Sequence, residues 1–588
     1  MRPTPRIRVH WKALATLVTG VMVGSCSDSG APSDLTEISF STALVHLDGI
    51  APETVIVRNS GGIAAGPVTL NPAAFTNSGG AAASGLTLQV TPAELATLNP
   101  GDSAVVTLRL ASISPSVADG TYLTTVGAAV ADTVQTILRV EVRVAECLRE
   151  PFRVAALSGP ASIVQGDVVR LIADVRDSTG AVAAAPCVSW NVAPTGAGYV
   201  TDDGTFVGYQ PGTATIIAAA GLGSDSIAVT IGARGLSGSF TTTGVGRISA
   251  RYSSDLWVHG TVAYQGTWSS RNGNRGNTLY VWDVSDATMP VLADSVTIDA
   301  GTVNDVKVRG DGALAVITHE GSSDGLNGVT LLDLADPLHP SVITRFFQSL
   351  ESGVHNVWID GDFLYVALDG ANPSGGLRVL DITDPANPSV VSSFYAGSSI
   401  LHDVYVRDGL AFLSHWNAGL VILDVGNGVA GGSPTNPVEV SRLAVAGGQT
   451  HNAWYWPAAG YVFVGEEDFS TPGIMHVIDV RDVSDPKEVG TYRVGGTTPH
   501  NFWLDEGSGV LYLAWYSNGL VALDVSGELL GELDKQGREY AVWQYSGSGG
   551  CPAAFGTATC TWAPQVLGGK IYIADMNTGL WIADRVGF

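Results

Sequence analysis

The segment LVILDV, residues 420–425, joins an uninterrupted apolar run to an aspartate, and its recurrence decides the fold. A short run of aliphatic and β-branched residues is typical of a strand buried on both faces. Six further copies occur: LYVWDVSD (279–286), VTLLDLAD (329–336), LRVLDITDP (377–385), MHVIDVRD (475–482), LVALDVSG (520–527) and LWIADRV (580–586). The seven copies place one aspartate at the same position of a repeating unit: Asp283, Asp333, Asp381, Asp424, Asp479, Asp524 and Asp584.

The unit recurs about every fifty residues. The residues that open successive copies are Ser254, Asn304, His355, His402, His451, His500 and Trp562, at spacings of 50, 51, 47, 49, 49 and 62. A period of this size in a chain of short Val-, Ile-, Thr- and Tyr-rich segments predicts a propeller or β array. Seven blades of four strands would close into a ring that leaves no exposed sheet edge.

The seventh copy lacks a fourth strand. Phe588 follows its third strand almost directly, whereas the strand-like segment LSGSFTTTG (236–244) precedes the first copy. We predict that this segment pairs beside Leu580–Arg585 and closes a propeller spanning 235–588. The copies resemble the LVIVD repeat family: the segment LVILDV differs little from the five letters that give the family its name. The resemblance covers roughly 250–588.

A chain of 588 residues is too long for one core, and two further β regions precede the propeller. Residues 38–145 alternate strand-like runs with turns, which predicts an Ig-like β-sandwich. In residues 148–233, the turn at Asp203–Val207 and the following Pro211–Ile216 resemble the bacterial Ig-like domain of group 2. That resemblance implies a spacer or adhesive module. The predicted fold class is all-β: two Ig-like β-sandwiches followed by a seven-bladed β-propeller.

The first 25 residues look like a signal peptide, because four basic residues precede the short apolar run 13–23. The run is too short to span a membrane. The sequence VGSC (23–26) resembles the bacterial lipobox, which implies a cell-envelope lipoprotein lipidated on Cys26. Ser27 at the next position, rather than Asp, resembles the signal for delivery to the outer membrane, and we expect a monomer. An ordinary secretion signal with a chance cysteine is the alternative. Residues 26–37 are small and polar, as in a tether.

The remaining cysteines, Cys147, Cys187, Cys551 and Cys560, allow three pairings. The sequence-local choice, Cys147–Cys187 with Cys551–Cys560, is expected in an oxidising compartment, and free buried thiols are the alternative. The formal charge is −25, or −29 without the four basic residues of the leader. Such a negative field argues against nucleic acid as a partner.

Histidine followed by Asn or Asp opens four consecutive copies, at His355, His402, His451 and His500. The start of a first strand lies beside the end of the second in an antiparallel meander, so residues at both positions should share one face. The candidate ligand-binding face comprises His319, His355, His402, His415, Glu466, Trp454 and Asp575.

Three interpretations of these histidines stay open. They satisfy buried backbone groups of the next blade; or His402, His451 and His500, with His415 or Glu466, hold copper or zinc; or the face binds a protein or carbohydrate ligand through its tryptophans. We predict a binding platform held off the membrane by Ig-like spacers, with a metal-dependent enzyme as the alternative and a scaffold for partner proteins as a third option. The sequence contains no nucleophile elbow, phosphate loop, HExxH or EF-hand motif, so no catalytic residue is assigned.

Overall fold

The computed structural model describes residues 36–47, 52–114, 116–144, 152–183, 187–221, 223–369, 375–397, 400–445, 447–470, 472–548, 551 and 558–588. Cys26, Cys147 and the predicted leader lie outside these residues. Every regular element within them is a strand, apart from one turn of 3-10 helix, η2 (Leu533–Lys535). None of the described helical structure has the length and apolar character needed to cross a membrane.

The chain forms two compact units. The first contains the described residues 36–144 together with Cys187, and the second contains 152–183 and 188–588. Cys187 is disulfide-bonded.

The first unit consists of two main sheets that share one core. One sheet has the order β1 (Ile38–Phe40), β3 (Glu53–Asn59), β9 (Ser103–Ile113), β7 (Leu86–Thr91). The other has the order β2 (Leu44–Leu47), β11 (Thr133–Val144), β10 (Gly120–Val130), β4 (Val68–Pro72), β8 (Glu94–Leu95), with β5 (Phe75–Asn77) and β6 (Ala82–Ala83) beside it. Val55 and Val57 of β3 pack with Val140 of β11 in that core, because alternate residues of each strand face inward.

The second unit begins with another pair of sheets. The larger has the order β15 (Ile172–Arg176), β12 (Arg153–Ser158), β20 (Gly223–Gly232), β19 (Gly212–Ala220), β16 (Ser189–Ala193), with β13 (Ser162–Val164) on β20. The smaller has the order β14 (Val168–Arg170), β18 (Thr205–Gly208), β17 (Gly198–Val200). Phe206 from the small sheet packs with Ile216 and Val229 from the large one.

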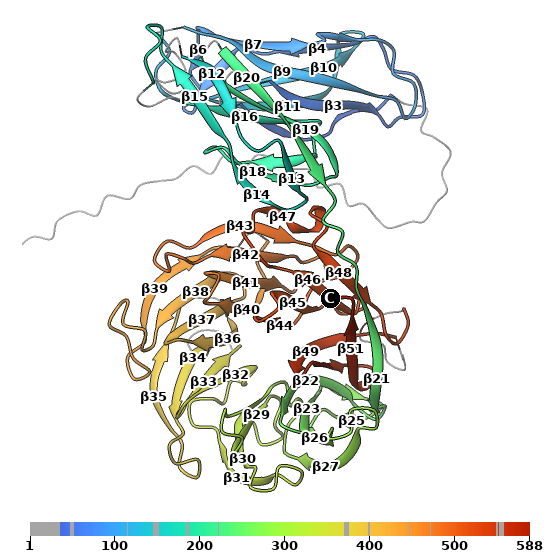
Figure 1. The fold of residues 1–588 in the computed structure, drawn as a ribbon, viewed down its shortest axis with the longest axis vertical. Helices are drawn as coiled ribbons and strands as arrows, with labels where there is room; N and C mark the ends of the chain where they lie inside the picture. Colours follow the sequence, from blue (N-terminus) through green and yellow to red (C-terminus); the bar gives the residue numbers. More distant parts are fainter. Residues whose placement is uncertain are drawn as a thin grey trace, which may run out of the picture. The chain divides into compact units, whose positions relative to one another are not determined.

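The described residues from 239 onward form seven sheets arranged as a propeller (Figure 1). The innermost strands are β22 (Tyr252–His259), β28 (Val306–Val308), β32 (Asn356–Asp360), β36 (Leu401–Arg407), β40 (Thr450–Trp456), β44 (Phe502–Asp505) and β49 (Thr561–Leu567). The second strands are β23 (Val262–Trp268), β29 (Leu314–His319), β33 (Phe363–Leu368), β37 (Leu410–His415), β41 (Tyr461–Glu466), β45 (Val510–Ala514) and β50 (Lys570–Asp575).

The outer half of each sheet follows the same order. The third strands are β26 (Thr278–Asp283), β30 (Gly328–Asp333), β34 (Gly376–Asp381), β38 (Gly419–Asp424), β42 (Met475–Asp479), β46 (Leu520–Asp524) and β51 (Gly579–Val586). The outermost strands are β27 (Val291–Thr297), β31 (Ser341–Phe346), β35 (Ser389–Phe394), β39 (Val438–Leu443), β43 (Lys487–Tyr492), β48 (Glu539–Trp543) and β21 (Ser239–Arg247). A hairpin of β24 (Ser270–Arg271) and β25 (Asn274–Arg275) follows β23, and β47 (Gly531–Glu532) extends the fifth sheet.

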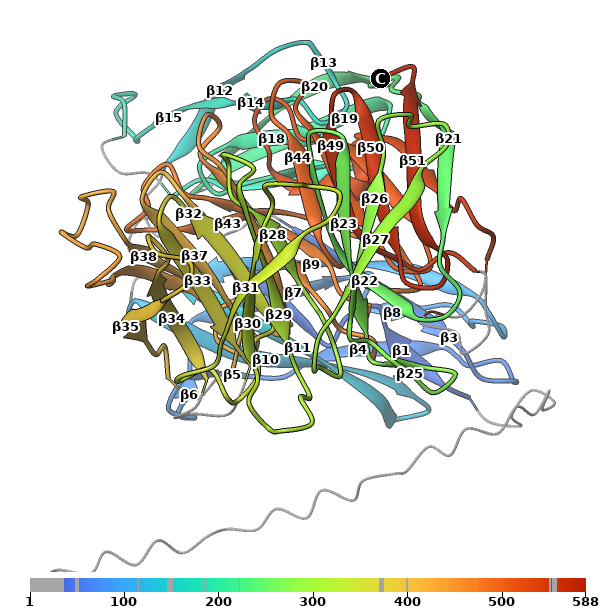
Figure 2. The ribbon, with the colours of Figure 1, turned by 90° about the horizontal axis from the view of Figure 1, so that it is seen from below.

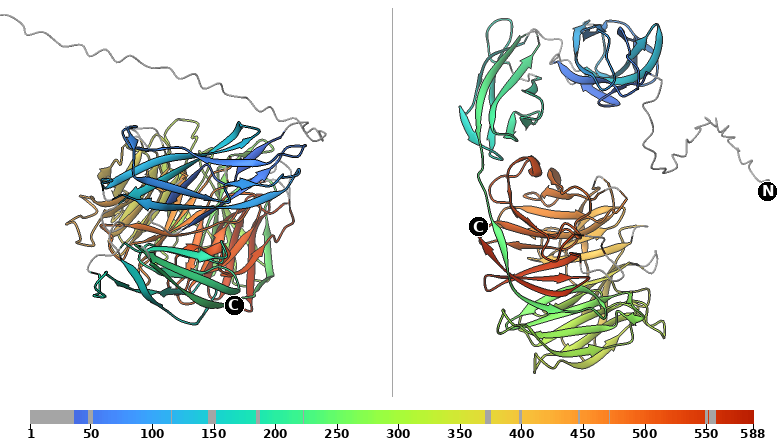
Figure 3. Two further views of the ribbon diagram at one scale, coloured as in Figure 1. Left: turned by 90° about the horizontal axis from the view of Figure 1, so that it is seen from above. Right: turned by 90° about the vertical axis from the view of Figure 1, so that its right-hand side faces the viewer.

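The ring closes on itself at two levels. Each innermost strand contacts the next, and β49 contacts β22. At the periphery, β21 pairs antiparallel with β51 from Ser239↔Val586 to Arg247↔Gly579, so the last sheet takes its outer strand from before the first blade. Figure 2 also draws β21 beside β51, and Figure 3 shows the C-terminus lying next to the chain of β21. Cys551 and Cys560, in the segment before β49, form a disulfide.

The LVILDV signature has a direct structural basis. In β38 all six residues from Gly419 to Asp424 are buried, because neighbouring blades cover both faces of the sheet. The aspartate at the end of the strand caps the turn that follows. In six of the blades a carboxylate oxygen accepts a hydrogen bond from the backbone N–H two residues later, at Asp283, Asp333, Asp381, Asp424, Asp479 and Asp524.

Candidate functional site

A distortion of the innermost strands directs two consecutive side chains at the propeller axis. The pairing register of the innermost strand shifts at Ser254 and Asp255 in β22, at His402 in β36, at His451 in β40 and at Trp562 in β49. A bulge adds a residue to one strand and turns its side chain toward the face of its neighbour. The opening residue of a blade and the residue after it therefore both face the axis.

Three layers of side chains consequently line the axis. We call the first the opening ring: Ser254, Asn304, His355, His402, His451, His500 and Trp562. The middle ring follows, with Asp255, Asp305, Asn356, Asp403, Asn452, Asn501 and Ala563. The aromatic ring comes last, with Trp257, Trp358, Tyr405, Trp454 and Trp503, and Lys307 at the equivalent position of the second blade.

The histidines of the opening ring stack in one arc. Ring centroids lie 4.0 Å apart for His355 and His402, 4.4 Å for His402 and His451, and 4.2 Å for His451 and His500. Trp562 continues the arc, 4.1 Å from His500. The four imidazoles that the repeat aligned are thus brought together.

Several opening-ring side chains link one blade to the next. His402 Nδ1 lies 3.1 Å from the carbonyl oxygen of His451, and His500 Nδ1 lies 2.7 Å from that of Trp562. Asn304 makes the same bond in its blade, donating through Nδ2 to the carbonyl of His355 at 2.9 Å. A carbonyl only accepts, so Nδ1 of both histidines carries the proton and Nε2 keeps a lone pair. These bonds support the structural interpretation of the repeated histidines.

The middle ring is a polar belt, and the buried ammonium of Lys307 reaches into it from the aromatic ring. Lys307 Nζ lies 2.8 Å from Asp255 Oδ2 and also contacts Asp305. Asp305 Oδ2 in turn accepts a hydrogen bond from the backbone N–H of Val357 in the next blade, at 2.8 Å. Burial raises the pKa of Asp403 to about 7, opposed by the nearby ammonium of Lys307. Burial also raises the pKa of Asp305 well above its usual value, so the carboxylate that stays ionised beside Lys307 is that of Asp255, whose pKa is lowered.

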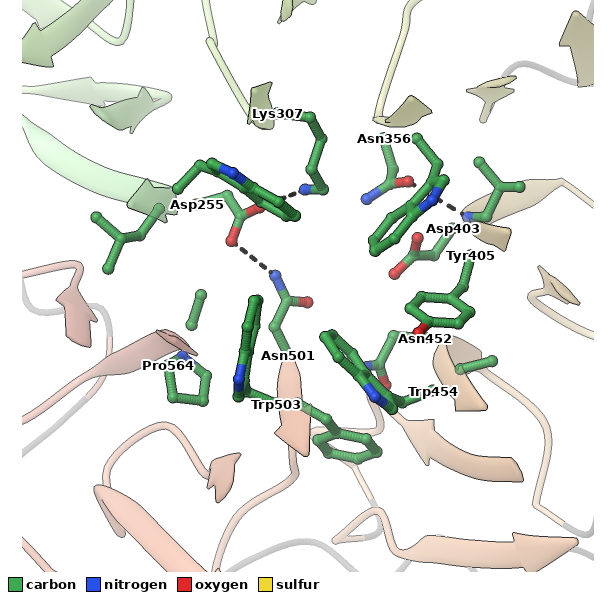
Figure 4. A pocket seen from close by; sticks show the side chains of 17 residues that line it. Asp255, Lys307, Asn356, Asp403, Tyr405, Asn452, Trp454, Asn501, Trp503 and Pro564 are labelled. Carbon is green, nitrogen blue, oxygen red and sulfur yellow. Dashed lines mark hydrogen bonds and ion pairs between the residues drawn. The ribbon is translucent and has the colours of Figure 1, made fainter. Parts of the chain in front are cut away.

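The aromatic ring lies at one mouth of the channel along the propeller axis, and the histidine-bearing opening ring lies at the opposite end. Figure 4 shows Trp454, Trp503 and Tyr405 of this ring beside Asp403, Asn452 and Asn501 of the middle ring. Trp454 and Trp503 lie with centroids 5.0 Å apart, and Trp358 packs at 4.4 Å from Tyr405. Lys307 Nζ lies 5.4 Å from the centre of the Trp257 ring, a distance typical of a cation–π contact.

A cavity of about 240 Å³ lies against the opposite, histidine-bearing end. Its walls are largely aromatic, and it is lined by Trp268, His355, His402, Glu467, Phe469, His500, Tyr516, Trp562 and Met576. The Tyr516 hydroxyl donates a short hydrogen bond to Glu467 Oε1. Phe469 is 60% exposed, so the cavity has an apolar side chain at its outer edge.

Burial and charge divide the histidines into two kinds. Burial lowers the pKa of His402, His451 and His500 well below the usual value, so these three rings are neutral. Burial also disfavours the charged form of His355, but the carboxylates of Glu320 (2.7 Å from Nδ1) and Asp369 raise its pKa to about 9. Burial raises the pKa of Glu467 to about 7.

The predicted ligand face is only partly assembled. His355 and His402 line the cavity, whereas Trp454 belongs to the aromatic ring at the other mouth. The residues that end the second strands lie at the expected end of the blades but are packed inside them. His319 Nε2 lies 2.6 Å from Thr330 Oγ1, His415 is 1% exposed, and Asp575 accepts hydrogen bonds from Tyr545 and Thr578. None of these three lines the cavity.

Glu466 is also occupied within its blade. Its Oε1 atom lies 3.1 Å from His476 Nε2, and Oε2 accepts from the backbone N–H of Ile474 at 3.3 Å. The carboxylate that reaches the cavity belongs to the next residue, Glu467. Glu467 was not predicted, although it follows directly on Glu466, whereas Tyr516 belongs to the aromatic residues expected to offer flat surfaces to a ligand.

Comparisons with known proteins support the repeat assignment. Residues 250–298, 353–395 and 400–445 match the LVIVD repeat, so the chain contains LVIVD repeats in at least three blades. Among solved structures, the chain is similar to the β-propeller domain of Cps50 (Swd1) from Myceliophteria thermophila, with a TM-score of 0.41 and 12% identity over 58% of this chain and 99% of that chain. A search of curated proteins found no match.

Proposed function

We propose that the propeller is a binding platform and that its ligand site is the cavity at the opening ring. The observation that carries this proposal is the cavity of about 240 Å³, walled by Trp268, Tyr516 and Trp562 and containing one carboxylate, Glu467. Ligand pockets are typically concave and apolar, with a few polar groups that orient the ligand. The ligand class that fits is a small molecule with a flat apolar ring and one hydrogen-bonding group.

Tryptophan fluorescence of the full chain, titrated with p-cresol as a ring-shaped probe, tests this proposal. We expect a saturable change in emission that Trp268→Ala abolishes, because that substitution removes one aromatic wall of the cavity. Trp454→Ala is the matched control: it removes the same side chain from the other mouth of the channel and should leave the titration unchanged. Loss of the signal in the Trp454 variant alone would contradict the proposed location.

The cellular setting is a second part of the proposal. Residues 1–25 would direct export, a lipid on Cys26 would hold the protein in the outer membrane, and the two N-terminal β regions would act as Ig-like spacers. The Cys551–Cys560 disulfide and the disulfide-bonded Cys187 support an oxidising compartment. Cys26→Ser should move the protein from the membrane fraction to the soluble fraction of cells and abolish labelling by palmitate; retention in the membrane would contradict lipid anchoring.

A metal-dependent enzyme is the second candidate function. The observation that favours it is the group of His402, His451 and Glu467, whose side chains lie close together. Two of these residues, His402 and Glu467, line the cavity. An enzyme would need a metal ion at this group and a substrate in the same cavity.

A further inference from the structure

We propose that His402, His451 and Glu467 bind one divalent transition-metal ion, with zinc or copper as the class, at the wall of the opening-ring cavity. The inference deepens the proposed function, because the ion would lie where the cavity ligand binds. One ligand atom from each residue falls within 4.8 Å of the other two. The residues come from neighbouring blades: His402 from β36, His451 from β40, and Glu467 from the position directly after β41.

His402 is prepared for metal binding by its own hydrogen bond. Nδ1 donates to the carbonyl oxygen of His451 at 3.1 Å, which fixes the neutral tautomer and leaves the lone pair on Nε2. Imidazoles that bind metals commonly donate their other N–H to a carbonyl or carboxylate in this way. The bond orients the ring and keeps it from turning away from the cavity.

His451 makes no hydrogen bond of standard geometry. It is 2% exposed, and neither of its ring nitrogens, nor Oδ1 of adjacent Asn452, has a partner of standard hydrogen-bonding geometry among the described residues, although the Asn452 side chain lies close enough to oppose the lowering of the His451 pKa by burial. Buried polar atoms are nearly always paired, and exceptions mark places where water or an ion completes the structure. Glu467 Oε2 lies 3.8 Å from His451 Nε2, which is too far for a hydrogen bond.

One carboxylate oxygen of Glu467 accepts a hydrogen bond, and the other is directed at His451. The hydroxyl of Tyr516 donates to Oε1, while Oε2 faces His451. The Glu467 side chain is only 14% exposed, and a buried carboxylate is costly without a counter-charge. An ion between Oε2 and the two imidazoles would supply that charge.

The donor set selects the class of ion. Two imidazole nitrogens and one carboxylate oxygen suit zinc or copper, whereas calcium and magnesium prefer oxygen ligands throughout. Ligands about 2.0–2.2 Å from a tetrahedral ion lie about 3.3–3.5 Å apart. The 3.8 Å separation of His451 and Glu467 would therefore need to shrink by only a few tenths of an ångström. Three protein ligands leave one position open to the cavity.

A second group, Glu320, His355 and Asp369, provides an internal control. Its ligand atoms are also close together, but His355 Nδ1 already lies 2.7 Å from Glu320 Oε1 in an ion pair. A protonated imidazole does not bind a metal ion. Each group contains one glutamate, so the same substitution, glutamate to glutamine, tests both.

The experiment uses untagged full-length protein, stripped with a chelator and titrated with Zn²⁺ by calorimetry and with Co²⁺ by visible absorption. We expect one equivalent of Zn²⁺ to bind and the Co²⁺ complex to show the bands of a four-coordinate site. Glu467→Gln keeps the side-chain volume and an acceptor for Tyr516, and it should weaken Zn²⁺ binding at least tenfold without changing the thermal midpoint of the metal-free protein. Glu320→Gln should change the affinity less than twofold.

Two outcomes overturn the inference: no saturable Zn²⁺ or Co²⁺ binding by folded protein, or binding weakened by Glu320→Gln and unaffected by Glu467→Gln. The p-cresol titration separates this failure from failure of the proposed function. If the protein binds p-cresol saturably but does not bind Zn²⁺, only the metal site is rejected. If it binds Zn²⁺ but not p-cresol, the metal site is supported and the ring-ligand proposal is rejected.

Discussion

His500 illustrates how one side chain can carry the contact between two blades. Its Nδ1 donates to the carbonyl of Trp562 at 2.7 Å, and its ring packs at 4.2 Å from His451. We predict that His500→Ala lowers the free energy of unfolding by about 2–4 kcal/mol, because it leaves a buried carbonyl without a donor and opens a cavity. Urea unfolding followed by tryptophan fluorescence would measure the loss.

His500→Asn is the matched variant, since Asn304 makes the equivalent bond to the next blade with its Nδ2 atom. We expect it to recover at least half of the loss. If alanine and asparagine destabilised equally, the hydrogen bond would not be the source of the effect, and ring stacking would account for it.

His319 sets a pH dependence within a single blade. Burial, with a smaller contribution from Arg345, lowers its pKa to about 3, and its Nε2 lies 2.6 Å from Thr330 Oγ1. In the unfolded chain this imidazole is protonated below about pH 6.5, whereas in the folded chain it stays neutral down to about pH 3. Its contribution to the free energy of unfolding is therefore fully present above pH 6.5 and is lost as the pH falls toward 3. From pH 7 to 5 we expect this imidazole to cost about 2 kcal/mol.

Leucine occupies the equivalent position of the third blade, at Leu368, so His319→Leu is a natural comparison. The difference in unfolding free energy between pH 7 and pH 5 should be smaller in the variant by that amount. An identical pH dependence in both proteins would show that His319 is protonated in the folded state.

At the level of single elements, β21 determines whether the ring is closed. Phe240 in β21 stacks on Trp543 at 5.4 Å and packs against Phe588 at 5.3 Å, joining the outermost strand to the sixth blade and the C-terminus. We predict that Phe240→Ala destabilises the propeller by about 3–5 kcal/mol. Hydrogen exchange should show the largest loss of protection in β21 and β51, which pair directly. A loss of protection spread evenly over all seven blades would contradict this role.

The strands of the propeller also show which features could be predicted from the sequence and which could not. The third-strand aspartates and the opening residues could be aligned because most blades repeat the turn hydrogen bond of the aspartate, so the arc from His355 to His500 followed from the period. The second-strand ends were placed at the correct end of the blades, but their side chains point into the sheets. A shift of one residue reverses the face in a strand, which is why Glu466 was predicted and Glu467 reaches the cavity.

The bulges explain the rest of the difference. At His402 and His451 the innermost strand gains a residue relative to its partner, so two consecutive side chains face the axis. Strict alternation would have allowed only one. The bulge interrupts the pairing of the innermost strand with the second strand, and hydrogen bonds to the neighbouring blade, such as that from His402 to His451, offset the lost pairing. These stabilising contacts come from a distant part of the chain, so no local sequence pattern predicts the bulge.

At the scale of the second unit, two arginines join the sheets of residues 152–232 to the propeller. Arg538 is 1% exposed and donates through Nη2 to the carbonyl of Gly166 at 2.8 Å and through Nη1 to that of Ser526 at 3.0 Å. Arg234 Nη2 lies 2.6 Å from Asp524 Oδ2, the third-strand aspartate of the sixth blade. The repeat signature therefore serves both its own turn and this junction.

These contacts predict cooperative unfolding of residues 152–588. Replacing Arg538 with methionine keeps much of the volume but leaves the carbonyls of Gly166 and Ser526 without their donor, so the junction should weaken while each part stays folded. Calorimetry should show one transition for this unit in the wild type and two in the variant. Lys487→Gln, which removes an exposed cation 2.9 Å from Asp485, should leave the single transition intact. A single transition in the Arg538 variant would mean that the two parts remain coupled through other contacts, such as the Tyr209 hydroxyl that accepts from the N–H of Glu532 at 2.9 Å.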